Sequence, residues 1–272
     1  MKHLSRTYMV LVFLLLYAPI LVVVAFSVNS AESLSHFEGV SFHWYAELFE
    51  DEEALTALRN SLILAVVSSV LATVLGVVAA FTIDRAKRKW LARTMESVSN
   101  IPMMNPDIVT GVSLMLLFVG IAAILRSQPF LGVWTMIVAH TTFNLPYVIL
   151  SVLPKFREMD RSLSEAALDL GCTPGKTFFR VELPYIMPGA ISGLMMSFAL
   201  SLDDFVISHF VSSPDFRTLP LYIYNQTVHD VKFSMYALCT LIVFVVLAVL
   251  IAVNVMGSFR DSRNRRKAGA KQ

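Results

Sequence analysis

Three aspartates, Asp107, Asp203 and Asp204, lie inside long apolar stretches of the sequence. A carboxylate inside a membrane is costly, and it usually faces an aqueous or protein-lined cavity. Asp204 belongs to a polar stripe at helical spacing. The other members of the stripe are Ser197, Ser201 and Ser208. The stripe predicts a path for a cation lined by Ser201 and Asp204. Asp203 lies about 100° away and is also a candidate for the path, with a neighbouring helix as the other surface it can face. A structural pair or a hydrogen bond at a helix end is the alternative for each aspartate.

Asp107 follows two prolines, Pro102 and Pro106, which interrupt a helix. Broken helices at membrane depth tend to line cavities, so Asp107 is a second candidate for the path. Five aromatic residues are weaker candidates, because an aromatic face attracts a cation by roughly 0.5–2 kcal/mol. They are Trp44, Trp134, Tyr147, Phe205 and Tyr222. Ordinary packing or anchoring at the membrane interface is the alternative for each.

The remaining chemistry-bearing residues predict neither a metal site nor a catalytic centre. His140 and His209 lie in apolar stretches without a second ligand at metal spacing, so structural polar contacts are expected for both. The two cysteines, Cys172 and Cys239, are too few for a disulfide framework or a cysteine zinc cluster. No nucleophile lies at a spacing that suggests an adjacent base. We therefore expect a protein that is not an enzyme.

The composition indicates a polytopic membrane protein. Of the 272 residues, 56% are hydrophobic and 15% are charged, and the mean hydropathy is +0.65. Soluble domains average about 45–50% apolar and about 25% charged residues, and disordered chains are less hydrophobic still. A net charge of +2 is too small to suggest a nucleic-acid surface.

Six stretches are long enough to cross a membrane, since about 20 mostly apolar residues span the hydrocarbon core. They cover approximately 8–28, 61–83, 98–125, 131–153, 188–211 and 233–255. The expected fold is therefore all-α, with six transmembrane helices in one domain over 1–272. The apolar run of the first stretch exceeds the 7–15 residues of a signal peptide, so we interpret it as a retained anchor.

The distribution of positive charge predicts the orientation. If the N-terminus lies in the cytoplasm, all but four of the 22 Lys and Arg residues fall in cytoplasmic segments. The four exceptions are Arg59, Arg126, Arg217 and Lys232. Cytoplasmic loops carry an excess of Lys and Arg, so both termini are expected in the cytoplasm.

The sequence of residues 154–183, a loop expected in the cytoplasm, predicts two short helices joined by a glycine turn. Ser162 and Glu165 have the spacing of a capping box. Gly171 occurs where a left-handed residue ends a helix, while Thr173 and Pro174 suit the start of the next one. One face of the first helix is apolar but small. It comprises Leu163, Ala166, Ala167 and Leu170. Such a face either lies on the protein's own helix bundle or docks into a groove on a partner.

The same loop resembles the EAA loop of bacterial ABC importer permeases. Glu165, Ala166 and Ala167 are followed after three residues by Gly171, and residues 181–184 read Val-Glu-Leu-Pro where the family has Ile-x-Leu-Pro. The resemblance implies that this loop is a coupling helix seated in a cytoplasmic ATPase. The coupling residues it implies are Glu165, Ala166, Ala167, Leu170 and Gly171.

Residues 171–177 also resemble a P-loop, but the spacing is wrong. A P-loop has four residues between its glycines and follows a strand. Here three residues separate Gly171 from Gly175, and a helical pattern precedes them. We therefore expect no cofactor in this chain, with ATP and magnesium handled by the partner ATPase.

Nearly the whole chain is most similar to spermidine/putrescine importer permeases. The similarity is carried by the EAA loop and by residues 17–19, 106–111, 201–206 and 210–214. It implies the transmembrane domain of a type I ABC importer in the bacterial inner membrane. The implied partners are a second permease, two ATPase subunits and an external polyamine-binding protein, besides membrane lipid. Another cargo such as a metal ion, a passive channel or scaffold, and a membrane-embedded enzyme are the alternatives.

Overall fold

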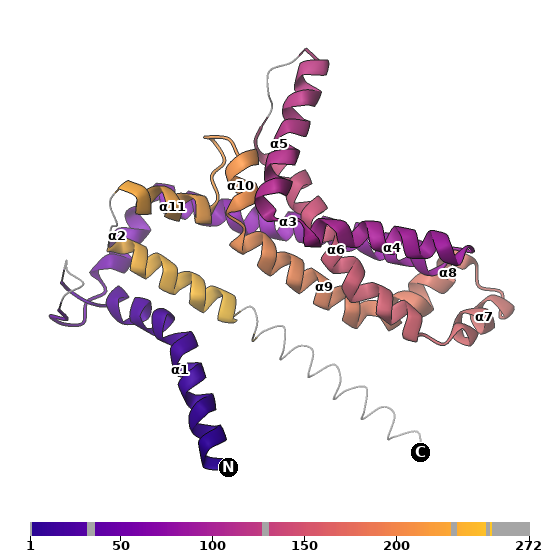
Figure 1. Cartoon of the computed structure of the whole chain (residues 1–272), viewed down its shortest axis with the longest axis horizontal. Coiled ribbons are helices and arrows are strands. Elements are labelled where there is room, and N and C mark those ends of the chain that lie inside the picture. Colours follow the sequence, from indigo (N-terminus) through magenta and orange to yellow (C-terminus); the bar gives the residue numbers. More distant parts are fainter. Residues whose placement is uncertain (1, 32–35, 127–130, 230–232, 249–250, 252–272) are drawn as a thin grey trace. The chain divides into compact units, whose positions relative to one another are not determined.

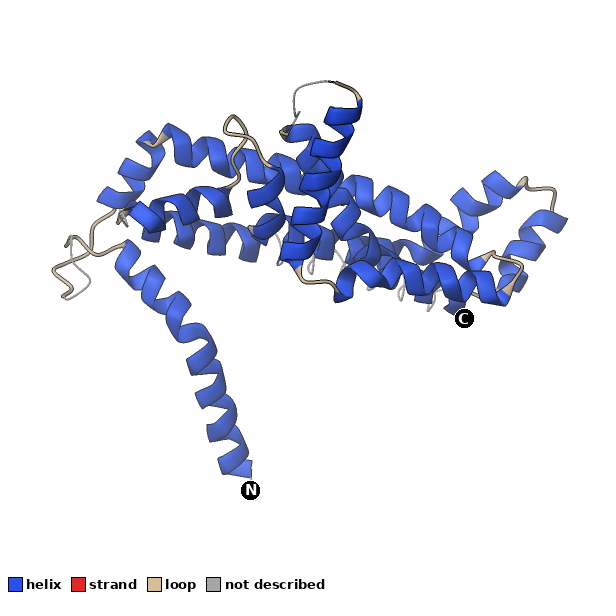
Figure 2. Cartoon of the chain, turned by 45° about the horizontal axis from the view of Figure 1, so that its top comes forward, coloured by secondary structure: helices blue, strands red, loops and turns tan. Residues whose placement is uncertain are grey.

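The structure is a computed structural model that describes residues 2–31, 36–126, 131–229, 233–248 and 251. In this part of the chain the regular elements are helices, and the only β pairings are two isolated bridges. Figure 2 shows these helices joined by loops and turns. The predicted all-α class is confirmed for the described residues.

Among the described residues, five helical stretches are long and apolar enough to cross a membrane. The first two are α1 (Lys2–Ser27) and α3 (Glu52–Asp84). The next two are α5 (Asp107–Ile124) and α6 (Val133–Glu158). The fifth runs over Pro174–Asp203, and a shorter apolar helix covers Ser234–Ala248. The predicted span 233–255 extends past that helix into positions outside the described residues.

The chain divides into two compact units. One comprises Met1–Leu55 with Gln226–Gln272, and the other comprises Thr56–Asn225. The first unit holds α1, α2 (His43–Glu50) and the short apolar helix. Its buried Trp44 donates an indole hydrogen bond of 2.7 Å to the Asn29 carbonyl and packs on Phe233. The single domain expected over 1–272 stays a prediction.

In the larger unit, α6 is the central helix. It packs against α4 (Lys89–Met104) and α9 (Leu183–Asp203), as Figure 1 shows. Small residues permit the close approach, because a Cβ added to Gly189 would lie 2.7 Å from the Ser151 carbonyl oxygen. A Cβ added to Gly76 of α3 would lie 2.5 Å from the Val148 side chain of α6. The helices α3, α4 and α9 therefore all pack against α6.

In the described residues of the larger unit, buried apolar side chains form clusters between these helices. The first joins α3, α6 and α9 through residues such as Ala80, Val152 and Ile186. The second joins α5, α6 and α10 (Val206–Val211) through Phe118, Met136 and Ile207. Lipid tails are as apolar as these side chains, so close van der Waals packing is the main stabilising term for contacts between helices in a membrane.

Two of the predicted spans are broken helices. The stretch 98–125 is divided between α4 and α5, because α4 ends at Met104 and α5 begins after Pro106, whose φ is −57°. The stretch 188–211 is divided after Asp203, where Asp204 takes an extended conformation with ψ 117°. The break expected at Pro102 and Pro106 is confirmed, whereas the prediction of a continuous helix over 188–211 was wrong. Each helix restarts after one or two extended residues.

The loop after α6 has the expected helices with one different cap. Asp160, and not Ser162, is the N-cap of α7 (Arg161–Asp169), and its carboxylate accepts the Ser162 N–H at 2.9 Å. The predicted capping box of Ser162 with Glu165 is therefore wrong. Gly171 has the predicted positive φ, at +86°. Thr173 caps α8 (Pro174–Thr177), with Pro174 in its first turn.

Candidate functional site

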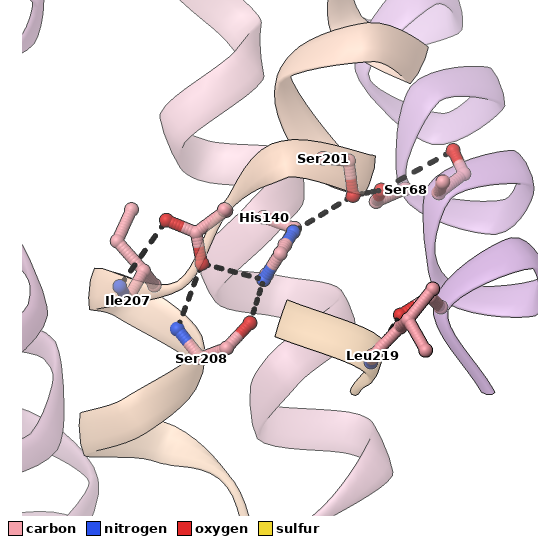
Figure 3. A network of polar contacts seen from close by, with 9 residues as sticks. Ser68, His140, Ser201, Ile207, Ser208 and Leu219 are labelled. Carbon is pink, nitrogen blue, oxygen red and sulfur yellow. Dashed lines mark hydrogen bonds and ion pairs between the residues drawn. The ribbon is translucent and has the colours of Figure 1, made fainter. Parts of the chain in front are cut away.

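A buried polar network lies where α9 breaks (Figure 3). His140 of α6 is at its centre, with Nδ1 2.8 Å from the Ser201 hydroxyl and Nε2 3.2 Å from the Ser208 hydroxyl. Ser201 also shares a hydrogen bond of 3.0 Å with Ser68 of α3. The network therefore connects α3, α6, α9 and α10 through side chains that are all buried.

Asp204 closes this network from the loop between α9 and α10. Its two carboxylate oxygens accept the N–H groups of Ile207 and Ser208, at 3.2 and 2.8 Å, so they cap α10. One of them lies 3.5 Å from His140 Nε2, and the Asp204 side chain is only 6% exposed. The carboxylate therefore faces the protein interior.

Asp203 has the opposite environment, because it is exposed at the last position of α9. Both aspartates were candidates for the path, with Asp204 the better one, but the structure buries the Asp204 side chain and exposes Asp203. Ser201 and Ser208 lie on the same side as Asp204, as the stripe predicted. That side is buried against His140 of α6 and does not face a path.

Asp107 lies at the second helix break and is exposed in the first turn of α5. A carboxylate there is favoured by the partial positive charge of the helix N-terminus. One turn later, Gly111 lets α5 approach α10, since a Cβ there would lie 2.9 Å from Phe210 and 3.4 Å from Ile207 Cα. The element that carries Asp107 therefore packs against the element that follows Asp203 and Asp204.

The aromatic candidates lie in different environments. Trp44 is buried in the smaller unit, and Tyr222 is also buried. Trp134 is 79% exposed, and Tyr147 packs at the edge of Phe143. Phe205, at the break itself, packs against two residues that we had not selected. They are Tyr224 at 4.7 Å and His209 at 5.5 Å between ring centroids.

The structural polar contacts expected for His140 are confirmed, but its partners were not predicted from the sequence. The signal was a lone imidazole in one apolar span and a serine stripe in another. Because one helix repeats its side chains every 3.6 residues, periodicity identifies the members of a stripe but not the residue that faces them from another helix. Only the packing of α6 on α9 brings these groups together.

The predicted coupling residues lie on and just after α7, which leaves its apolar face uncovered. Leu170 is 87% exposed, and Leu163, Glu165 and Ala166 are exposed as well. Ala167 is half-buried, and Ser164 is the buried residue of this helix.

Hydrogen bonds from the Ser162 N–H and hydroxyl lower the pKa of the Asp160 carboxyl, so the ionised form that caps α7 is maintained at neutral pH.

Residues 72–260 match the family described as binding-protein-dependent transport system inner membrane component. The chain belongs to this family of transport permeases. The permease is therefore a multi-pass membrane protein, which agrees with its apolar helices.

Relatives over most of the permease are named as polyamine transporters. The putrescine transport system permease protein PotI of Escherichia coli is 40% identical over 230 residues, which is 85% of this chain and 82% of the relative. The spermidine/putrescine transport system permease protein PotC of Haemophilus influenzae is 34% identical, covering 91% of this chain and 94% of the relative. The resemblance to polyamine permeases is thereby confirmed.

Solved structures confirm the predicted importer fold. A chain of a bacterial ABC transporter that imports the acidic polysaccharide alginate aligns with a TM-score of 0.73 at 16% identity, covering 94% of this permease and 96% of that chain. A chain of the MetNI methionine ABC transporter aligns with a TM-score of 0.61 at 20% identity, covering 74% and 93%. The described part of this permease therefore has the fold of an ABC importer transmembrane domain.

Proposed function

We propose that this permease is one of two permease subunits of an ATP-driven importer for polyamines. The observation that carries the proposal is the identity of 32–40% over most of the chain with permeases named for putrescine and spermidine. The second permease, the two ATPase subunits and an external polyamine-binding protein complete the complex. ATP and magnesium bind in the ATPase subunits.

The exposed carboxylates support a cationic cargo. Polyamines carry separated ammonium groups, which match acids spaced along a path better than one dense acidic cluster. Asp107 and Asp203 are exposed at two helix breaks whose flanking helices, α5 and α10, pack together. Both acids are therefore proposed to contact the cargo, while Asp204 and Ser201 hold the shape of the break through His140.

The loop that contains α7 is proposed to face the cytoplasm and to dock into a cleft of the ATPase. Its support is the exposed apolar face of α7 together with the EAA pattern of Glu165, Ala166, Ala167 and Gly171. A helix of small and apolar residues is suited to a groove on another protein. Both termini lie in the cytoplasm in this arrangement.

Uptake of labelled putrescine and spermidine tests the proposal. The permease, with its own ATPase, sister permease and binding protein, is expressed in cells that lack polyamine importers. We expect saturable uptake that requires ATP and is not inhibited by excess divalent metal or inorganic anion. Uptake of a metal ion in place of both polyamines would contradict the cargo assignment.

Asp203→Asn tests the path in the same cells, with Asp215→Asn as the matched control. Asp215 is an exposed aspartate in the turn near the bridge of Ser213 with Phe216. The first change removes an attraction for ammonium groups and is expected to lower uptake at least several-fold at an unchanged amount of assembled complex. Equal uptake by the two variants would remove Asp203 from the path.

A further inference from the structure

Glu182 is a buried carboxylate that connects three separate elements. It ends the π-helix η1 (Phe178–Glu182), just before α9, and its side chain is 2% exposed. Its Oε1 accepts a hydrogen bond of 2.8 Å from the Ser164 hydroxyl of α7. The same oxygen pairs with the guanidinium of Arg85, which follows α3. A buried carboxylate is seldom retained without such partners, because burying a charge is costly.

Aromatic packing reinforces the contact between α3 and η1. The Arg85 guanidinium lies over the ring of Phe81, 5.5 Å from its centroid. The edge of Phe178 in η1 packs on the same Phe81 ring, with the centroids 5.2 Å apart. The Arg85 guanidinium therefore contacts both the Phe81 ring of α3 and the Glu182 carboxylate of η1. It links these two elements.

A second charged contact joins α7 to the same end of α3. Arg161, at the start of α7, lies 4.0 Å from Asp84, the last residue of α3. The π-helical turn η1 between α8 and α9 is a second indication of function here, because such turns are rare and occur frequently at functional sites. The Ser164–Glu182 and Arg161–Asp84 contacts therefore connect α7 to the start of α9 and to the end of α3.

We propose that Glu182, with Arg85 and Ser164, forms a strut that transmits movement of α7 to α3 and α9. The proposal rests on the proposed function, in which α7 docks into the ATPase. Glu182 is in this case a positioning residue for coupling, since it touches neither ATP nor cargo. The strut makes α7 a rigid extension of the bundle, so a displacement of α7 by the ATPase displaces the ends of α3 and α9.

Glu182→Gln tests the strut, and Glu96→Gln is the matched control. Glu96 of α4 pairs with Arg157 of α6 at 2.7 Å, which is another ion pair between elements of the same unit but without contact to α7. The whole complex of permeases, ATPases and binding protein is reconstituted in lipid vesicles. ATP hydrolysis and polyamine uptake are measured on the same preparation and expressed per assembled complex.

We expect Glu182→Gln to retain ATP hydrolysis while uptake per ATP hydrolysed falls at least fivefold, with little change for Glu96→Gln. An unchanged ratio in Glu182→Gln overturns the strut, as does an equal fall in both variants. If Glu182→Gln does not assemble, Ser164→Ala decides, with the exposed Ser162→Ala as its control. Normal coupling in Ser164→Ala then overturns the proposal, and reduced coupling in that variant alone supports it.

A second readout does not depend on the cargo. Hydrogen exchange at the end of α3, over residues 80–86, is compared with and without a non-hydrolysable ATP analogue. The strut predicts an ATP-dependent change in the wild-type complex that is lost in Glu182→Gln and kept in Glu96→Gln. A change kept in Glu182→Gln, or absent from the wild type, overturns the strut. Absence of polyamine uptake by the wild type, by contrast, overturns only the proposed cargo.

Discussion

The imidazole of His140 connects α6 to the helices on both sides of the break, α9 and α10. Its two ring nitrogens meet hydroxyls from α9 and α10, and the capping carboxylate of Asp204 lies beside them. Inside a protein an unmade hydrogen bond costs more than a formed one contributes, because the buried group also loses its hydration. We therefore assign His140 to the stability of the helix break.

Replacing His140 with alanine should destabilise the permease. The change removes the His140 partner of the buried Ser208 hydroxyl, whereas Ser201 keeps its hydrogen bond to Ser68. A buried hydroxyl left unsatisfied costs about 1–3 kcal/mol. Thermal unfolding in detergent measures the loss. Thr142→Ala on the same helix is the control, since Thr142 is exposed and its hydroxyl bonds only to the Val138 carbonyl. Equal unfolding temperatures for the two variants would contradict the role of His140.

Asp204 should tolerate asparagine better than alanine. Asparagine and aspartate are similar N-caps, whereas alanine at a capping position costs about 0.5–2 kcal/mol. The amount of folded permease in membranes is therefore expected to be near normal for Asp204→Asn and lower for Asp204→Ala. Both variants at the wild-type level would show that the cap of α10 contributes little.

At the scale of elements, the turn between α7 and α8 depends on Gly171. Its φ of +86° is strained for side chains with a branched Cβ. Gly171→Val should therefore reorient α7 and lower both polyamine uptake and substrate-stimulated ATP hydrolysis, while the subunit still inserts. Gly175→Ala is the control, because a Cβ there meets nothing within 4 Å and its φ is not positive. Normal stimulated hydrolysis in Gly171→Val would refute the role of this turn.

The contact of α6 with α9 depends on the absence of a side chain at Gly189. Overpacking typically costs about 1–3 kcal/mol, and more where the neighbour is backbone that cannot move aside. Gly189→Ala should lower the unfolding temperature in detergent, since its Cβ would lie 2.7 Å from the Ser151 carbonyl oxygen. Gly120→Ala in α5, which has open space, should not. A similar effect of both changes would place the cost in helix flexibility and not in packing.

The sequence predicts where helices occur better than where they break. Long apolar runs identified the membrane helices, and Gly171, Thr173 and Pro174 identified the turns of the loop after α6. The break after Asp203 has no proline or glycine to announce it. It is stabilised by the Asp204 cap and by His140 from another helix, and contacts between distant segments leave no local pattern.

For the whole molecule, the two cysteines provide a test of orientation. Cys172 lies half-exposed in the turn between α7 and α8, and Cys239 lies in the short apolar helix. With Cys239→Ala in place, a membrane-impermeant maleimide should label Cys172 only after the cells are permeabilised. Labelling of intact cells would place the loop outside the cytoplasm and reverse the proposed orientation. The Cys172→Ala variant controls for background labelling.

The π-helix η1 has a consequence for the permitted length of this part of the chain. Each residue of an α-helix advances the chain by about 100° around the axis, and a turn with i→i+5 bonds accommodates an extra residue. Deleting one residue from 178–182 would therefore rotate everything before it by about 100° around the α9 axis. The leucine-bearing face of α7 would then point in another direction although its own sequence is unchanged. An insertion or deletion in 178–182 therefore changes the direction in which α7 faces. The number of residues in η1 is constrained as well as their types.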